Sequence, residues 1–83
     1  MKTPDITTRV LTEVIREKQK YGELPLRFIL TPLDYDCLCN DPSFKMFGKF
    51  EDNLVWYSKV PVMLNQAVKK SFAVTCFDEI LEI

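Results

Sequence analysis

Apolar residues return with helical spacing near the start of the chain. They stand at i, i+4, i+5, i+8 and i+9, and they are Ile6, Val10, Leu11, Val14 and Ile15. This spacing places them on one face of an α-helix. Thr3 can cap its start, Pro4 suits the first helical position, and Asp5 favours the positive end of the helix dipole. Gly22 can adopt the left-handed conformation that ends many helices. The pattern predicts a helix over residues 4–21.

The apolar period changes from helical to alternating in residues 24–31. One face of this segment would carry Leu26, Phe28 and Leu30. The opposite face would carry Arg27, Ile29 and Thr31. Because successive side chains of a strand point to opposite faces, this segment predicts a strand with one strongly apolar side.

A second helix is indicated directly after this strand, over residues 32–40. Thr31 can cap it, Pro32 suits its first turn, and Asp34 stands three residues after the cap, as in a capping box. A single further turn is expected to carry Phe44 and Phe47 inward.

The second half of the chain is rich in β-branched and aromatic residues, which predicts strands over 54–57 and 60–64. Pro61 cannot donate to a ladder, so its segment is expected to be an edge strand, a bulge or a break. Residues 71–77 alternate and predict the last clear strand, whereas residues 78–83 fit either a helical turn or a frayed strand.

These elements predict a single α+β domain over residues 1–83. An amphipathic N-terminal helix and one short helix would pack on one side of a three- to four-stranded antiparallel sheet. A chain of 83 residues is near the lower limit of what folds alone, but 47% of its residues are apolar. We therefore expect a true core, which a dimer could extend.

Charge and hydropathy disfavour several classes of partner. The formal net charge is −1, with 11 basic and 12 acidic residues interspersed, and binding to nucleic acid normally depends on a basic excess. The N-terminal segment is charged where a signal peptide would be apolar, and no apolar run is long enough to span a bilayer. We expect a cytoplasmic protein with no nucleic-acid or membrane partner.

The segment DYDCLCND, residues 34–41, is the densest group of potential metal ligands. On a helix, Cys37 and Cys39 would be about 200° apart and could not converge on one ion. The chain has three cysteines and no histidine, which argues against a zinc site, and the acids lack the glycine and glutamate positions of a calcium loop. We interpret the thiols as buried small apolar side chains and expect no metal and no cofactor.

Catalytic chemistry has few candidates in this composition. The absence of histidine removes the commonest general base, and two isolated glycines cannot build a phosphate-binding loop. Paired-carboxylate chemistry among Asp34, Glu51 and Asp52 is the arrangement that stays open. We expect no catalytic residue and no small-molecule substrate.

Apolar and aromatic residues on both faces of the strands suggest a surface for a partner. If Trp56 faces the core with Leu54, then Val55 and Tyr57 point away from it. Strand addition at an edge near Pro61 is a further way to bind a partner chain. The candidate partner-binding residues are Arg27, Ile29, Val55, Tyr57 and Pro61.

The stretches LTPLDYDCLCNDPSF and LVWYSKVPVML resemble a pattern in small uncharacterised proteins of tailed phages and prophages. The matching residues are Thr31, Asp34, Tyr35, Leu38, Asp41, Pro42, Phe44, Tyr57, Pro61 and Val62. The resemblance covers about half the chain. Where such patterns have a glycine before the proline–valine pair, this chain has Ser58, Lys59 and Val60. The resemblance implies a viral or mobile-element origin.

We therefore expect a small non-catalytic protein-binding module, in the phage interpretation one that engages a host or virion protein from the host cytoplasm. Two alternatives stay open. The first is a structural or assembly protein that acts as a homo-oligomer. The second is a small enzyme or ligand-binding protein that uses carboxylates.

Overall fold

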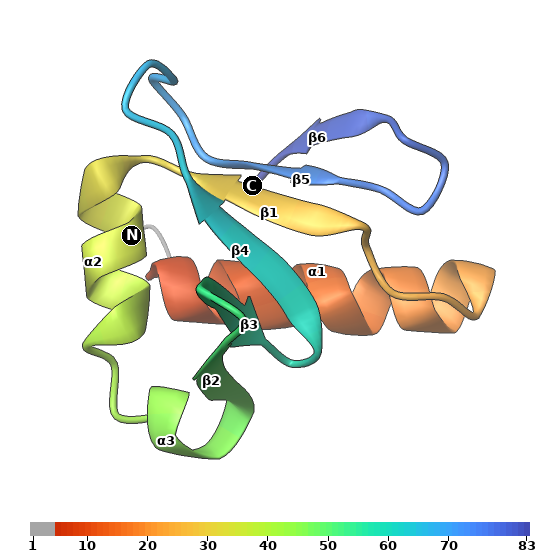
Figure 1. The fold of residues 1–83 in the computed structure, drawn as a ribbon. Coiled ribbons are helices and arrows are strands. Elements are labelled where there is room, and N and C mark those ends of the chain that lie inside the picture. Colours follow the sequence, from red (N-terminus) through yellow and green to blue (C-terminus); the bar gives the residue numbers. More distant parts are fainter. Residues whose placement is uncertain (1–4) are drawn as a thin grey trace.

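The computed structural model describes residues 5–83, in which one mixed sheet is covered on one face by helices (Figure 1). In chain order the elements are α1 (Ile6–Tyr21), β1 (Arg27–Leu30), α2 (Pro32–Cys39), α3 (Phe44–Phe47), β2 (Gly48–Glu51), β3 (Leu54–Tyr57), β4 (Val60–Leu64), β5 (Phe72–Val74) and β6 (Ile80–Glu82). The fold is α+β, as predicted.

The sheet has six strands in the order β2-β3-β4-β1-β5-β6, which corrects the expected three to four antiparallel strands. β1 and β4 are parallel, whereas the other neighbours are antiparallel. The parallel pair arises because the chain passes through α2, α3 and the β2–β3 hairpin before β4 lies beside β1. β2 was missed because it is short and largely exposed, without an apolar alternation, and β6 decides the open choice for residues 78–83 in favour of a strand.

Helix α1 is capped by Asp5 at its start and by Gly22 at its end. The backbone N–H of Thr8 donates to the Asp5 side chain at 2.8 Å, so Asp5 is the capping residue. The predicted cap Thr3 and the predicted first helical residue Pro4 lie outside the described residues. Gly22 has a φ of 73° and its N–H donates to the Lys18 carbonyl at 2.9 Å, which confirms the predicted left-handed end.

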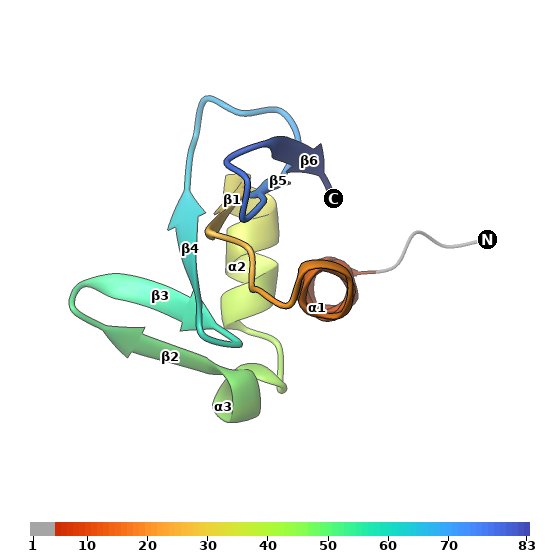
Figure 2. The ribbon, with the colours of Figure 1, turned by 90° about the vertical axis from the view of Figure 1, so that its right-hand side faces the viewer.

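The core lies between α1, α2 and the sheet. Its fully or almost fully buried apolar residues are Ile6, Val10, Val14, Phe28, Leu30, Leu38, Val55, Tyr57, Val60, Val62 and Ala73. Figure 2 shows both helices on the same side of the strands. Ile15 of the predicted stripe is 54% exposed, because it lies about 100° around the helix from buried Val14.

Two tight turns set the register of the central strands. Asp52 and Asn53 join β2 to β3, and Ser58 and Lys59 join β3 to β4; all four have φ between 52° and 69°. Two successive left-handed residues are the mark of a type I′ hairpin turn, whose twist matches that of its strands. The predicted bounds of β3 and β4 are confirmed.

The structure contradicts the prediction that Pro61 marks an edge. β4 is an interior strand with β3 on one side and β1 on the other. The Ser58–Lys59 turn makes Tyr57 and Val60 the closing hydrogen-bonded pair, so Trp56 and Pro61 form the next pair, which exchanges no backbone hydrogen bonds. Pro61 does not disturb the pairing with β3, because residue 61 donates no backbone hydrogen bond to that strand.

Helix α2 is capped by Thr31, as predicted. The backbone N–H of Asp34 donates to the Thr31 hydroxyl at 3.2 Å. In the single turn α3, Phe44 packs against the core, whereas Phe47 is 43% exposed, so the expected inward direction of Phe47 is only partly met. Among the described residues, no helix combines the length and the apolar composition that crossing a bilayer requires.

Candidate interaction surface

The face of the sheet opposite α1 and α2 carries two rows of mostly apolar side chains. In one row, Trp56 lies opposite Pro61 and Val74 lies between Arg27 and Ile80. In the other, Ile29 lies between Met63 and Phe72. We call this surface the open face, and it consists of Arg27, Ile29, Leu54, Trp56, Pro61, Met63, Phe72 and Ile80, with Val74 in the same row but only 5% exposed.

Within residues 5–83 the helices leave the open face uncovered (Figure 2). Met63 is 42% exposed and Ile80 is 72% exposed, while Ile29, Trp56 and Phe72 are half-buried by their neighbours. Charged side chains lie at its margins, with Lys49 beside Trp56 and Glu82 beside Phe72. Contiguous apolar surface with a charged rim is typical of a site where another macromolecule docks.

Three of the five predicted partner-binding residues lie on the open face, namely Arg27, Ile29 and Pro61. The other two do not. Val55 is 5% exposed and Tyr57 is fully buried, so the prediction that they face away from the core is wrong. The alternation along β3 was correct, but a shift of one residue reverses every side chain of a strand.

The phase of β3 is set by β4 and could have been inferred from it. Val60 and Val62 share one face, and the two-residue turn places Tyr57 opposite Val60 and Val55 opposite Val62. Val62 also lies beside Phe28 in the core. Counting across the turn from the Val-Pro-Val sequence would therefore have directed Val55 and Tyr57 inward and left Trp56 outside.

Tyr57 is suited to burial because its polar end has a partner. Its hydroxyl and that of Ser43 are 2.8 Å apart. The rings of Phe44 and Phe47 lie 6.4 and 6.0 Å from the Tyr57 ring. Burial raises the pKa of the Tyr57 phenol, and it stays neutral in the core.

Trp56 is, with Leu54, an open-face residue that the sequence interpretation placed in the core. Its indole N–H donates to the Glu51 carbonyl at 3.2 Å, which fixes the ring against the β2–β3 hairpin. A tryptophan that is held in place and half-exposed supplies a large contact area at low entropic cost, so Trp56 is the strongest single anchor on this surface.

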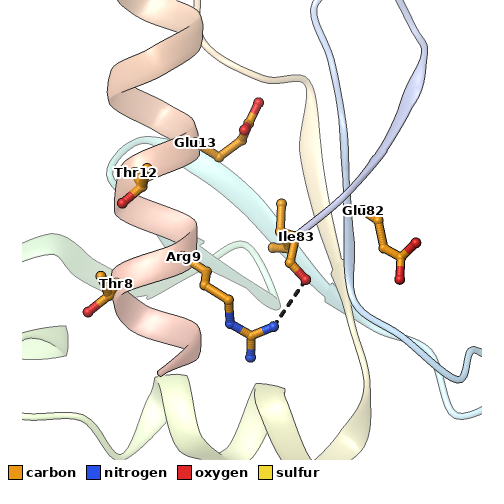
Figure 3. Close-up of a pocket in the computed structure, with 6 residues that line it drawn as sticks. All are labelled: Thr8, Arg9, Thr12, Glu13, Glu82 and Ile83. Carbon is orange, nitrogen blue, oxygen red and sulfur yellow. Dashed lines mark hydrogen bonds between the residues drawn. The ribbon is translucent and has the colours of Figure 1, made fainter. Parts of the chain in front are cut away.

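A small pocket between α1 and β6 is one of several hollows among the described residues (Figure 3). Arg9 reaches across it and donates to the Ile83 carbonyl at 3.0 Å, and its other terminal nitrogen lies 3.6 Å from Asp34. Figure 3 shows Glu13 on the helix and Glu82 on the strand, on either side of Ile83. Because Arg9 serves to tie β6 and α2 to α1, we assign this pocket a structural role.

Of the acids left open for paired-carboxylate chemistry, Glu51 and Asp52 lie together at the β2–β3 hairpin and Asp34 lies elsewhere. Asp34 lies at the start of α2 and accepts a hydrogen bond from Ser71 at 2.6 Å. Glu51 forms an ion pair with Lys49 at 2.7 Å, and Asp52 belongs to the hairpin turn. Glu51 and Asp52 line one pocket together with Lys49, Trp56 and Lys59, whereas Asp34 lines a different one.

A different pair of acids, Glu13 and Glu17, lies one turn apart on the buried side of α1. Glu17 is fully buried and accepts a hydrogen bond from the Cys76 N–H at 3.3 Å. Burial, followed by the hydrogen bond with Glu13, raises the pKa of Glu17 to about 7. Burial also pushes the Glu13 pKa upward, but the hydrogen bonds from Arg16, at 3.0 and 2.6 Å, act together with a hydrogen bond to Glu17 and with the charge of Arg16. Their sum leaves the Glu13 pKa below its usual value.

The cysteines are free and lie in different environments. Cys37 is exposed, which corrects the expectation that it is buried, while Cys39 and Cys76 are half-buried. Burial raises the pKa of the Cys39 and Cys76 thiols, and the nearby Asp36 and Glu17 charges raise them further, so both stay protonated at neutral pH. Across residues 5–83, no three Cys, Asp or Glu side chains are grouped closely enough to hold a metal ion.

Comparison of the chain with protein-family models, with curated proteins and with solved structures finds no match. Its possible function is therefore argued from its own surface.

Proposed function

We propose that this chain is a non-catalytic protein-binding module that docks a partner protein on the open face of its sheet. The observation that carries the proposal is that no helix among the described residues covers the two rows of open-face side chains. Trp56, Met63 and Ile80 are solvent-accessible, although the core lies on the other side of the same strands. A sheet face without a partner is normally polar, and an apolar sheet face is normally covered by a further layer of the same domain.

The residue types on the open face support a protein partner. Tryptophan and arginine are enriched among residues that dominate binding energy, and Trp56 and Arg27 both lie there. Isoleucine, methionine and phenylalanine fill the area between them, while lysine and glutamate stand at the margin. This is the division into an apolar centre and a polar rim that protein interfaces show.

The resemblance to small phage proteins suggests the form this function takes. A partner from the host cell or the virion would be the natural target of such a module. The proposal does not depend on that origin, since the open face would suit any protein with a complementary apolar patch.

Capture experiments with matched variants test the proposal. Met63→Asp places a charge at an exposed position near the middle of the open face, and Leu33→Asp places the same charge on α2 at a residue that is 73% exposed. We expect wild type and Leu33→Asp to retain the same partner from a host lysate, and Met63→Asp to lose it. Thermal melts must show all three proteins folded.

The proposal would be contradicted if all three proteins retained the same set of proteins. It would also be contradicted if Leu33→Asp lost the partner and Met63→Asp kept it. Either outcome would place the binding surface elsewhere on the molecule.

A further inference from the structure

Strand β2 is one edge of the sheet, with β3 as its neighbour (Figure 2). Its two faces differ in character. Lys49 and Glu51 project on the side of the open face, because Lys49 is paired with Trp56. Phe50 projects on the other side and is 69% exposed. An exposed edge strand that carries a large apolar side chain is unusual, since such edges readily pair with another chain.

The hydrogen-bond pattern shows which backbone groups of β2 are free to pair. Ser58 N–H donates to the Phe47 carbonyl at 2.8 Å, so Phe47 and Ser58 form a hydrogen-bonded pair. Such pairs alternate along an antiparallel ladder, which makes Lys49 and Trp56 the next one. The N–H and C=O of Phe50 therefore point outward, away from β3.

We infer that β2 pairs antiparallel with β2 of a second copy of this chain, with Phe50 opposite Phe50 of the partner subunit. The outward backbone groups of the two Phe50 residues would exchange two hydrogen bonds across a two-fold axis. Gly48 N–H already donates to the Phe44 carbonyl, so the shared ladder is short. The two sheets would join into one.

The charges of β2 select this register among those that its free backbone groups allow. With Phe50 at the centre, Lys49 of each copy lies opposite Glu51 of the other. Centring the pair on Lys49 would bring two lysines together, and centring it on Glu51 would bring two glutamates together, and like charges directly opposite one another are destabilising.

The same register also extends a contact that exists within one chain. Lys49 and Glu51 form an ion pair at 2.7 Å across the same face of β2. In the dimer, the two Lys49 and two Glu51 side chains would form a network of four alternating charges around the two-fold axis, and exposed ion pairs contribute more in a network than alone. On the opposite face, the two exposed Phe50 rings would cover one another.

Charge-exchange variants test this inference. Lys49→Glu makes residues 49 and 51 both acidic, and Glu51→Lys makes them both basic. In sedimentation velocity from about 10 µM to about 1 mM, we expect wild type to show a concentration-dependent dimer. Each variant alone should bind itself at least about tenfold more weakly, because both cross-strand pairs become repulsive. An equimolar mixture of the two variants should recover the dimer as a heterodimer.

Met63→Lys separates this edge contact from docking on the open face. It alters the open face and leaves β2 unchanged, so we expect it to dimerise like wild type. Dimers that persist in Lys49→Glu alone, or that vanish in Met63→Lys, would overturn the inference. A wild type that stays monomeric up to about 1 mM would overturn it as well.

Discussion

Ser71 closes the capping box of α2 from a distant part of the chain. Its hydroxyl accepts the Thr31 N–H at 3.0 Å and donates to the Asp34 carboxylate at 2.6 Å, while the Asp34 N–H bonds back to Thr31. In a local capping box the acid itself would take the Thr31 N–H. Here Ser71, just before β5, bridges the Thr31 N–H and the Asp34 carboxylate, so the cap of α2 depends on a residue far along the chain.

Replacing Ser71 by alanine should therefore destabilise the fold by about 2 kcal/mol, because the Thr31 N–H and the Asp34 carboxylate, both partly buried, lose a partner. Urea unfolding measures the change. Lys70→Ala is the matched control, since Lys70 is the neighbouring residue and its side chain is 77% exposed. Equal effects of the two substitutions would show that the Ser71 hydroxyl adds no stability.

Glu17 makes stability depend on pH in an uncommon direction. Folded Glu17 keeps its proton up to a pKa of about 7, whereas the unfolded chain releases it near 4.5. The folded state thus binds more protons between these values, and stability should fall as pH rises from about 4.5 to about 7. Glu17→Gln keeps an acceptor for Cys76 and removes the titration.

We expect Glu17→Gln to be more stable than wild type at pH 8, by up to about 3 kcal/mol, with the difference shrinking toward pH 5. Urea unfolding at both pH values measures it. Glu23→Gln, at an exposed position just beyond the helix, is the control and should change little at either pH. A Glu17→Gln effect that is the same at pH 5 and pH 8 would contradict the burial-driven shift of the Glu17 pKa.

The stripe of α1 is tested by a charge at its centre. Val10 is fully buried, so Val10→Asp should unfold the domain by leaving an unpaired charge in the core. Thr12→Asp adds the same charge on the exposed side of the helix and should shift stability by no more than about 0.5 kcal/mol. A cooperative thermal melt of Val10→Asp near the wild-type temperature would refute the placement of the stripe.

The β3–β4 turn stores a small amount of backbone strain that glycine should relieve. Lys59 has a φ of 69°, a left-handed conformation that side chains with a Cβ adopt only at a cost. Lys59→Gly should stabilise the domain by about 0.5 to 1 kcal/mol, after the greater freedom of glycine in the unfolded chain is deducted. Gln19→Gly, inside α1, should destabilise by about 1 kcal/mol. Thermal unfolding should show a higher melting temperature for Lys59→Gly and a lower one for Gln19→Gly than for wild type.

The sequence by itself determined the features that depend on residues close together in the chain. The Thr31 cap, the end of α1 at Gly22 and the bounds of β3 and β4 were predicted because each depends on hydrogen bonds or turns within a few residues. The alternation of the open-face strands was visible for the same reason, and it led to Arg27 and Ile29, whereas Pro61 was chosen for an edge position that β4 does not have.

Only the tertiary structure decided which face of each strand is buried and which strands are neighbours. Val55 and Tyr57 are inside, and Trp56 is outside, because β4 fixes the phase of β3 and lies beside β1. A strand pattern has two equivalent phases until a partner strand chooses between them. That choice is made by residues far along the chain, which is why local spacing predicted the elements and misplaced part of the surface.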